Sequence, residues 1–150
     1  MKKTKAFRTA LLFVLAFAMI LGAMCCTFCN NDIPTAEAYG TIYDMLSPEL
    51  ISIYETEIAG EPIVSKLGDA KLQRTADRLE ITVAKLKAIM LLQDLCARVG
   101  EDITLSRLAT MKDFALIKLA KEQAEKYAAT LPETRRSELK EKFLAAIKKG

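Results

Sequence analysis

The sequence predicts an all-α protein: a small antiparallel bundle of three to four helices after an N-terminal signal or anchor segment. Apolar residues from residue 48 onward recur at steps of three and four, which is the helical period. No stretch alternates apolar and polar residues for long enough to form a strand. The connections between the predicted helices are short, and helices joined by short loops pack as antiparallel neighbours.

The first 38 residues have the three-part pattern of a secretory signal peptide. A short basic start precedes an uncharged apolar stretch from residue 10 to 28, and polar residues follow it. Small residues at Ala36 and Ala38 fit the two positions that a signal peptidase recognises. We therefore predict that residues 1–38 are a signal peptide cleaved after Ala38, and that residues 39–150 form a single helical domain.

Two alternatives to cleavage stay open for this segment. The apolar stretch from residue 10 to 28 approaches the roughly 20 residues of a membrane-spanning helix. An uncleaved anchor would keep the basic N-terminus in the cytoplasm and the domain outside. The third reading is a lipoprotein acylated at Cys25 or Cys26, although Met24 is larger than the residue expected before such a cysteine. All three readings predict export, to the periplasm or beyond the cell.

Composition excludes several classes of function. The chain has no His, which removes the commonest general base and the usual nitrogen ligand of zinc and haem. Of four cysteines only Cys96 lies beyond residue 29, so the domain has no second thiol for an internal disulfide. Four of the 22 basic and two of the 19 acidic residues precede residue 39, so the domain is nearly neutral. That balance predicts no binding of nucleic acid.

The first helix is predicted over about residues 48–59. Ser47 followed by Pro48 fits an N-cap with proline in the first turn, because the residue before a proline avoids helical geometry. Gly60 and Pro62 end the helix. The segment around it carries acidic residues and no basic residue.

Three of those acids, Glu55, Glu57 and Glu61, are candidates for acid–base chemistry. Positions two apart in a helix do not face each other, so a shared site is geometrically poor. They also lack the glycine and the spacing of a calcium-binding loop. We therefore predict that these carboxylates are solvated surface groups.

The second helix is predicted to run without interruption from an N-cap at Asp69 to a stop at Gly100. Its apolar positions form one stripe at steps of four and three: Leu72, Ala76, Leu79, Val83, Leu86 and Met90. A second stripe joins it, so we expect near-complete burial around residues 89–92 and a core position for Cys96. Thirty helical residues would span about 45 Å, which leaves room for a kink.

Two more helices follow. The third is capped by Thr104 or Asp102 and runs to about Thr130, because Pro132 prevents a smooth continuation. The last helix covers about residues 132–148 and presents an apolar residue at every fourth position.

The last helix is also basic and amphipathic. Its candidate surface consists of Arg135, Arg136, Lys140 and Lys142, opposite an apolar stripe. This helix is predicted either to contact an acidic partner or an anionic membrane, or to pack its apolar side into the domain with its bases solvated. The acidic first helix is its natural neighbour, within the chain or in a second copy.

The sequence therefore predicts an exported, non-enzymatic helical protein that binds another protein in the cell envelope, as an adaptor, inhibitor or chaperone-like module. No catalytic, cofactor-binding or metal-binding residue is predicted. One alternative is a membrane-anchored subunit of an envelope assembly, and another is a small lipid or ligand carrier with a pocket between helices. Self-association is compatible with each.

Overall fold

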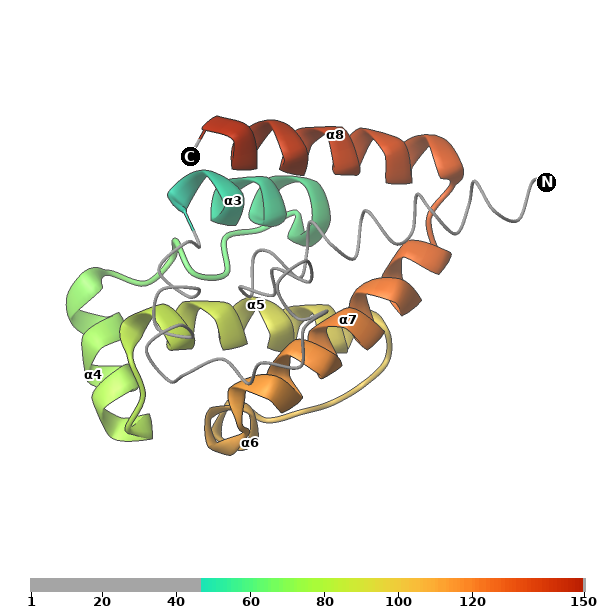
Figure 1. The fold of residues 1–150 in the computed structure, drawn as a ribbon. Coiled ribbons are helices and arrows are strands. Elements are labelled where there is room, and N and C mark those ends of the chain that lie inside the picture. The colour runs from blue at the N-terminus through green and yellow to red at the C-terminus, as the bar shows by residue number, and fades with distance from the viewer. Residues whose placement is uncertain (1–46, 150) are drawn as a thin grey trace, which may run out of the picture.

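The computed structural model describes residues 47–149, and all of their regular structure is helical (Figure 1). The all-α class is therefore confirmed for this part of the chain. The predicted signal peptide or anchor, with its alternatives, lies outside the described residues. Within residues 47–149, no helix is long and apolar enough to cross a membrane.

The described residues form six α-helices, whereas the sequence predicted three to four. They are α3 (Pro48–Ile53), α4 (Asp69–Leu79), α5 (Val83–Arg98), α6 (Leu105–Thr110), α7 (Asp113–Ala129) and α8 (Glu133–Lys149), and α3 continues into a π-helical segment, η2 (Tyr54–Ala59). In Figure 1, α3 and α8 lie side by side at one face, α5 runs through the middle, and α7 crosses obliquely towards α8. The first and last described helices are thus neighbours in space.

The local signals at the two ends of the chain predict the structure well. The Ser47 hydroxyl accepts a hydrogen bond from the Leu50 amide (3.2 Å), and Gly60 ends the segment at a left-handed φ of 70°. The predicted first helix therefore has the right extent, although its second half is π-helical. The last helix, Glu133–Lys149, also matches its prediction to within a residue.

The single helix predicted between Asp69 and Gly100 is wrong, because the chain breaks into α4 and α5. Glu80 takes a left-handed φ of 58°, and the Ile81 amide donates to the Ala76 carbonyl (3.0 Å) to close the end of α4. Thr82 then caps α5 by accepting from the Lys85 amide (3.1 Å). The break lets α4 fold back so that its apolar stripe is buried against α5.

The predicted third helix also breaks, at Met111, which has an extended backbone (ψ 144°) between α6 and α7. Of the two predicted caps, Thr104 and Asp102, it is Thr104 that caps α6. The break is held by a contact from another helix, because Lys85 Nζ donates to the Met111 carbonyl (3.2 Å) and lies 3.5 Å from Asp113. A contact between residues this far apart in the sequence cannot be predicted from the spacing of apolar residues.

The core is built around α5. Ile89, Leu91 and Leu92 are buried, which confirms the predicted burial around residues 89–92, and Cys96 is a core residue as predicted. The apolar side of α8, including Leu139 and Phe143, is buried as well. The interpretation in which α8 packs its apolar side into the domain therefore agrees with the structure.

The two left-handed residues that follow α4 and α5 allow a paired stability test. Replacing Glu80 with glycine is expected to raise the free energy of unfolding by about 0.5–1 kcal/mol, because only glycine adopts this φ without steric cost. Replacing Gly100 (φ 84°) with alanine is expected to lower it by a similar amount. An added methyl group there would meet no atom within 4 Å, so the cost would come from the backbone alone. Urea denaturation measures both, and equal signs would contradict this account.

Candidate functional site

The predicted basic surface on α8 is partly paired within the chain. Arg135 Nη2 donates to Glu57 Oε2 (2.9 Å) and to the Glu57 carbonyl (3.0 Å), and Lys142 Nζ donates to Glu57 Oε1 (2.6 Å). The acidic first helical segment is thus the intramolecular neighbour of the basic helix. Arg136 and Lys140 are half-buried, and the buried Nε of Arg136 has no hydrogen-bond partner within the described residues.

Glu55 is the main correction to the predicted acidic surface, because its side chain is only 7 % exposed. Its Oε1 accepts hydrogen bonds from three consecutive backbone amides, those of Ile63 (2.9 Å), Val64 (2.7 Å) and Ser65 (2.9 Å). Its Oε2 accepts from the Ser65 hydroxyl. One carboxylate therefore fixes the connection between η2 and α4, residues 60–68, which has no regular structure to satisfy these amides.

Hydrogen bonding sets the charge state of this carboxylate. Burial alone raises the pKa of Glu55, but the hydrogen bonds from Ser65, Ile63 and Val64 outweigh it and hold the pKa below the usual value. The pKa of Glu57 is lowered too, by hydrogen bonds from Lys142 and Arg135. The hydrogen bonds of both Glu55 and Glu57 therefore stabilise the ionised form of the carboxyl group.

Acidification is consequently expected to destabilise the fold. A carboxylate whose pKa is lower when folded contributes stability that is fully present above its unfolded pKa, about 4.5, and is lost as the pH falls through the folded value. Urea denaturation at several pH values from about 7 to about 2 would measure this loss. The Glu55→Gln variant should lose less stability over the same range. An equal loss would mean that Glu55 takes no part.

A second network joins η2 to α5. The Tyr54 hydroxyl donates to Asp94 Oδ2 (2.7 Å), and Arg98 Nε donates to the same oxygen (2.8 Å). Arg98 Nη2 also donates to the carbonyl of Ala59 (2.8 Å), at the end of η2. Burial, followed by the neighbouring Asp94 charge, raises the pKa of Tyr54 far above its usual value, so this phenol stays protonated. The network holds the start of the 60–68 connection against α5.

The connection between α5 and α6 is held in a comparable way. Gln93 Nε2 donates to the carbonyl of Ile103 (3.0 Å). Glu101 accepts from Lys126 Nζ (2.5 Å) and from Gln123 Nε2 (3.1 Å), both on α7. The amide of Glu101 donates to the carbonyl of Cys96 (2.8 Å) beyond the left-handed Gly100. Side chains of α5 and α7 thus fix residues 101–105 from both sides.

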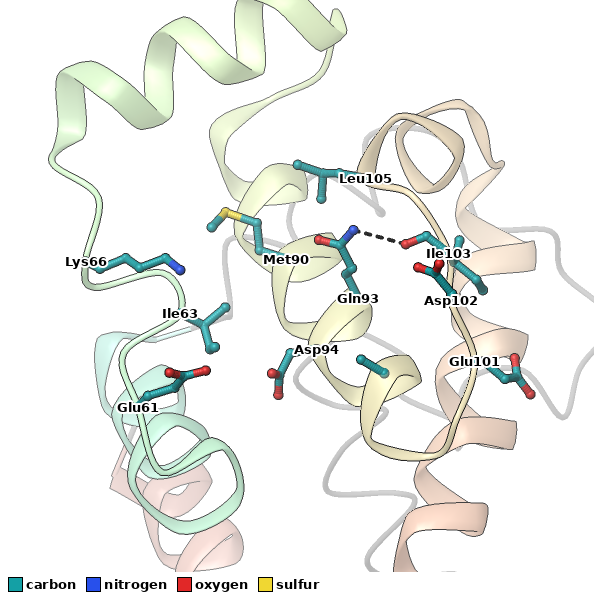
Figure 2. A pocket seen from close by; sticks show the side chains of 11 residues that line it. Glu61, Ile63, Lys66, Met90, Gln93, Asp94, Glu101, Asp102, Ile103 and Leu105 are labelled. Carbon is teal, nitrogen blue, oxygen red and sulfur yellow. Dashed lines mark hydrogen bonds between the residues drawn. The ribbon is translucent and has the colours of Figure 1, made fainter.

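A groove of about 390 Å³ lies between these two fixed connections (Figure 2). Its floor is one side of α5, with Met90, Gln93, Asp94 and Ala97, and its walls are Glu61, Ile63 and Lys66 on one side and Glu101, Asp102, Ile103 and Leu105 on the other. Figure 2 shows Glu61 and Asp94 on the same side of α5 and Asp102 on the opposite wall. The Glu101 side chain points away from α5, towards its partners on α7. We call this feature the α5 groove.

Cys96 lies next to this floor but offers no reactive thiol. Its side chain is fully buried, and burial together with the Glu101 charge raises the pKa of the thiol to about 11. A thiol is a nucleophile only as its thiolate, so Cys96 behaves as a small core residue. Within residues 47–149, no cluster of three or more His, Cys, Asp and Glu side chains is placed to hold a metal ion.

Comparison with protein families, with curated proteins and with solved structures finds no match to this chain.

Sequence reasoning did not find the α5 groove. Its floor residues Gln93, Asp94 and Ala97 lie on the polar side of a helix that was predicted mainly from its apolar stripes. A usable signal did exist, because these positions lie at steps of three and four on one helix face. The two walls depend on hydrogen bonds such as that of Glu55 with Val64, which no spacing rule indicates.

Proposed function

We propose that the protein is an exported, non-enzymatic helical protein that acts by binding another protein in the cell envelope, and that the α5 groove is its binding face. Residues 1–38 would direct export, and the helices around α5 would form one small bundle that presents the groove. The observation that carries the proposal is the groove with both walls pinned by side chains. A face ordered before the partner arrives costs less entropy on binding.

One property of the groove and one of α8 favour a protein partner over the other candidates. The α5 groove is lined by Glu61, Asp94 and Asp102, and burying such carboxylates against an acyl chain would be costly, which argues against a lipid carrier. The apolar residues Leu139 and Phe143 of α8 are occupied inside the domain, which argues against α8 inserting into a membrane. Anchoring through residues 10–28 remains the alternative for how the domain is held in the envelope.

A photo-cross-linking amino acid at Ala97 tests the binding claim in intact cells. Ala97 is exposed on the groove floor, whereas Ala145 is exposed on α8, which does not line the groove. We expect illumination to give one adduct of defined mass from position 97 and none of that mass from position 145. No adduct, or the same adducts from both positions, would argue against the proposal.

The proposed export signal has its own test. Intact mass of the protein recovered from the envelope fraction distinguishes the three fates of residues 1–38. A chain that begins at Tyr39 would support cleavage, an unprocessed chain would support the anchor, and a lipid-modified chain would support acylation. Recovery of the unprocessed chain from the cytosol alone would overturn the export proposal.

A further inference from the structure

Resting on the proposed function, we propose that the occupant of the α5 groove is a short basic, amphipathic segment of the partner protein. Its apolar side chains would contact Met90, Ala97 and Leu105, and its Lys or Arg side chains would pair with Glu61 and Asp102. Three features of the groove point to this occupant: its size, the apolar side chains exposed in its floor and walls, and its excess of hydrogen-bond acceptors.

The size of the groove and the apolar side chains exposed in it indicate that the occupant inserts a few apolar side chains. A volume of about 390 Å³ falls at the lower end of the roughly 300–1,000 Å³ of typical ligand pockets. Met90, Ile63 and Leu105 are only partly covered by the rest of the domain, so the groove exposes apolar surface that an occupant would bury. Met90 belongs to α5, the helix around which the core is built, and the connections that carry Ile63 and Leu105 are fixed by side-chain hydrogen bonds, so this apolar surface is held in place.

The charges indicate a basic occupant. Asp94 already holds Tyr54 and Arg98, and Glu101 already holds Lys126. Glu61 and Asp102 are exposed and make no hydrogen bond or ion pair within residues 47–149. These two free carboxylates lie on opposite walls, so cations at both sides of a bound segment would each find one.

The neutral side chain of Gln93 also favours a basic occupant. Gln93 uses its amide nitrogen for the Ile103 carbonyl, and Figure 2 shows its free oxygen on the side of Met90. Lys66 is the basic residue of the groove, set against the acceptors of Gln93, Glu61 and Asp102. An acceptor-rich groove binds donor-rich groups, and Lys and Arg carry donors without acceptors. An acidic segment would instead meet like charge.

A second copy of this chain is the main competing occupant. Phe114 on α7 is 68 % exposed, and Lys118 follows it one turn later, so another copy would present an aromatic group beside a base. Such an occupant would make the groove a self-association site. The experiment below separates this outcome from a basic segment of another protein.

The test uses the full chain in a neutral detergent and a fluorescent nine-residue peptide of lysine, leucine and alanine. A matched peptide with glutamate in place of lysine is the charge control, and binding to micelles alone is subtracted. We expect the lysine peptide to bind, and the glutamate peptide not to bind, by fluorescence anisotropy. Added salt should weaken binding, because the pairs with Glu61 and Asp102 are exposed to solvent.

Two variants locate the binding in the groove. Neutralising both free acids, Glu61→Gln with Asp102→Asn, should raise the Kd of the lysine peptide roughly tenfold, because exposed ion pairs contribute up to about 1 kcal/mol each. Ala97→Gln should also weaken binding, because the longer neutral side chain would occupy space in the groove that the peptide needs. The matched control neutralises two exposed acids outside the groove, Glu125→Gln with Glu141→Gln, and should leave the Kd unchanged. Circular dichroism confirms that each variant is folded.

Equal Kd values in the groove variant and the control variant would overturn the inference. So would concentration-dependent dimers that Ala97→Gln makes monomeric, because the occupant would then be a second copy. Failure of the peptide alongside a specific cross-link from position 97 would leave the proposed function standing and overturn only the basic class of partner. Failure of both would overturn both proposals.

Discussion

Replacing Glu55 with alanine is expected to lower the free energy of unfolding by about 3 kcal/mol, because three backbone amides would lose a charged acceptor. The amide of Val64 is the most costly of the three, since it is buried and water reaches it poorly. Glu55→Gln should cost less, because an amide oxygen can still accept from one or two of these donors.

Urea denaturation measures the effect, and Glu61→Gln is the matched control six residues away. Glu61 is exposed and makes no hydrogen bond or ion pair within the described residues, so its replacement should change stability by less than about 0.5 kcal/mol. If Glu55→Ala were as mild as this control, the carboxylate would not be what fixes the 60–68 connection.

Because that connection is one wall of the α5 groove, Glu55→Ala should also weaken ligand binding without touching the ligand. The Glu55 side chain does not line the groove. A folded Glu55→Ala variant with undiminished affinity for the lysine peptide would show that binding does not depend on the hydrogen bonds that Glu55 makes to the 60–68 connection.

Replacing Phe143 with alanine is expected to have the largest effect on stability, a loss of about 3–5 kcal/mol. Its ring is fully buried, and α8 contacts α3 on that side of the domain. The loss combines the removed apolar surface with the cavity left behind, because the neighbouring helices can close it only in part.

Glu141→Ala on the same helix is the control for Phe143→Ala. Glu141 is exposed, so this change should shift the free energy of unfolding by less than about 0.5 kcal/mol. Thermal unfolding followed by circular dichroism compares the two. If Phe143→Ala melted together with the unmodified chain, α8 would not be an integral part of the domain.

The sequence was informative wherever structure depends on neighbouring residues. Ser47 and Pro48 mark the start of α3, Gly60 marks the end of η2, and Pro132 separates α7 from α8. These residues restrict the backbone by themselves, through capping or through their own φ preferences.

The two internal breaks could not be predicted with the same rules. Glu80 adopts a left-handed conformation that its own side chain disfavours, so its local preference argues against the observed turn. Packing of α4 against α5 outweighs that preference. Thr82 was the local signal of the first break, because threonine is a favoured N-cap residue and here it caps α5.

The site depended even more on contacts between distant residues. Helical spacing places Glu55 and Glu57 correctly on one segment, but their surroundings come from residues 63–65 and from α8. The charge pattern predicted that the acidic helix would be the neighbour of the basic one, within the chain or in a second copy, and the structure shows the contact within the chain. It could not separate Glu55, which is buried, from Glu61, which is exposed.

The contact between α3 and α8 has a consequence for biosynthesis. α3 begins at Pro48 and α8 at Glu133, so α3 leaves the ribosome 133 − 48 = 85 residues before the helix against which it packs, and their contact can form only near the end of synthesis. Because α3 and α8 are the first and last described helices, their contact cannot form early in synthesis. A protein exported as proposed would be able to cross the membrane as an open chain and complete its core on the far side.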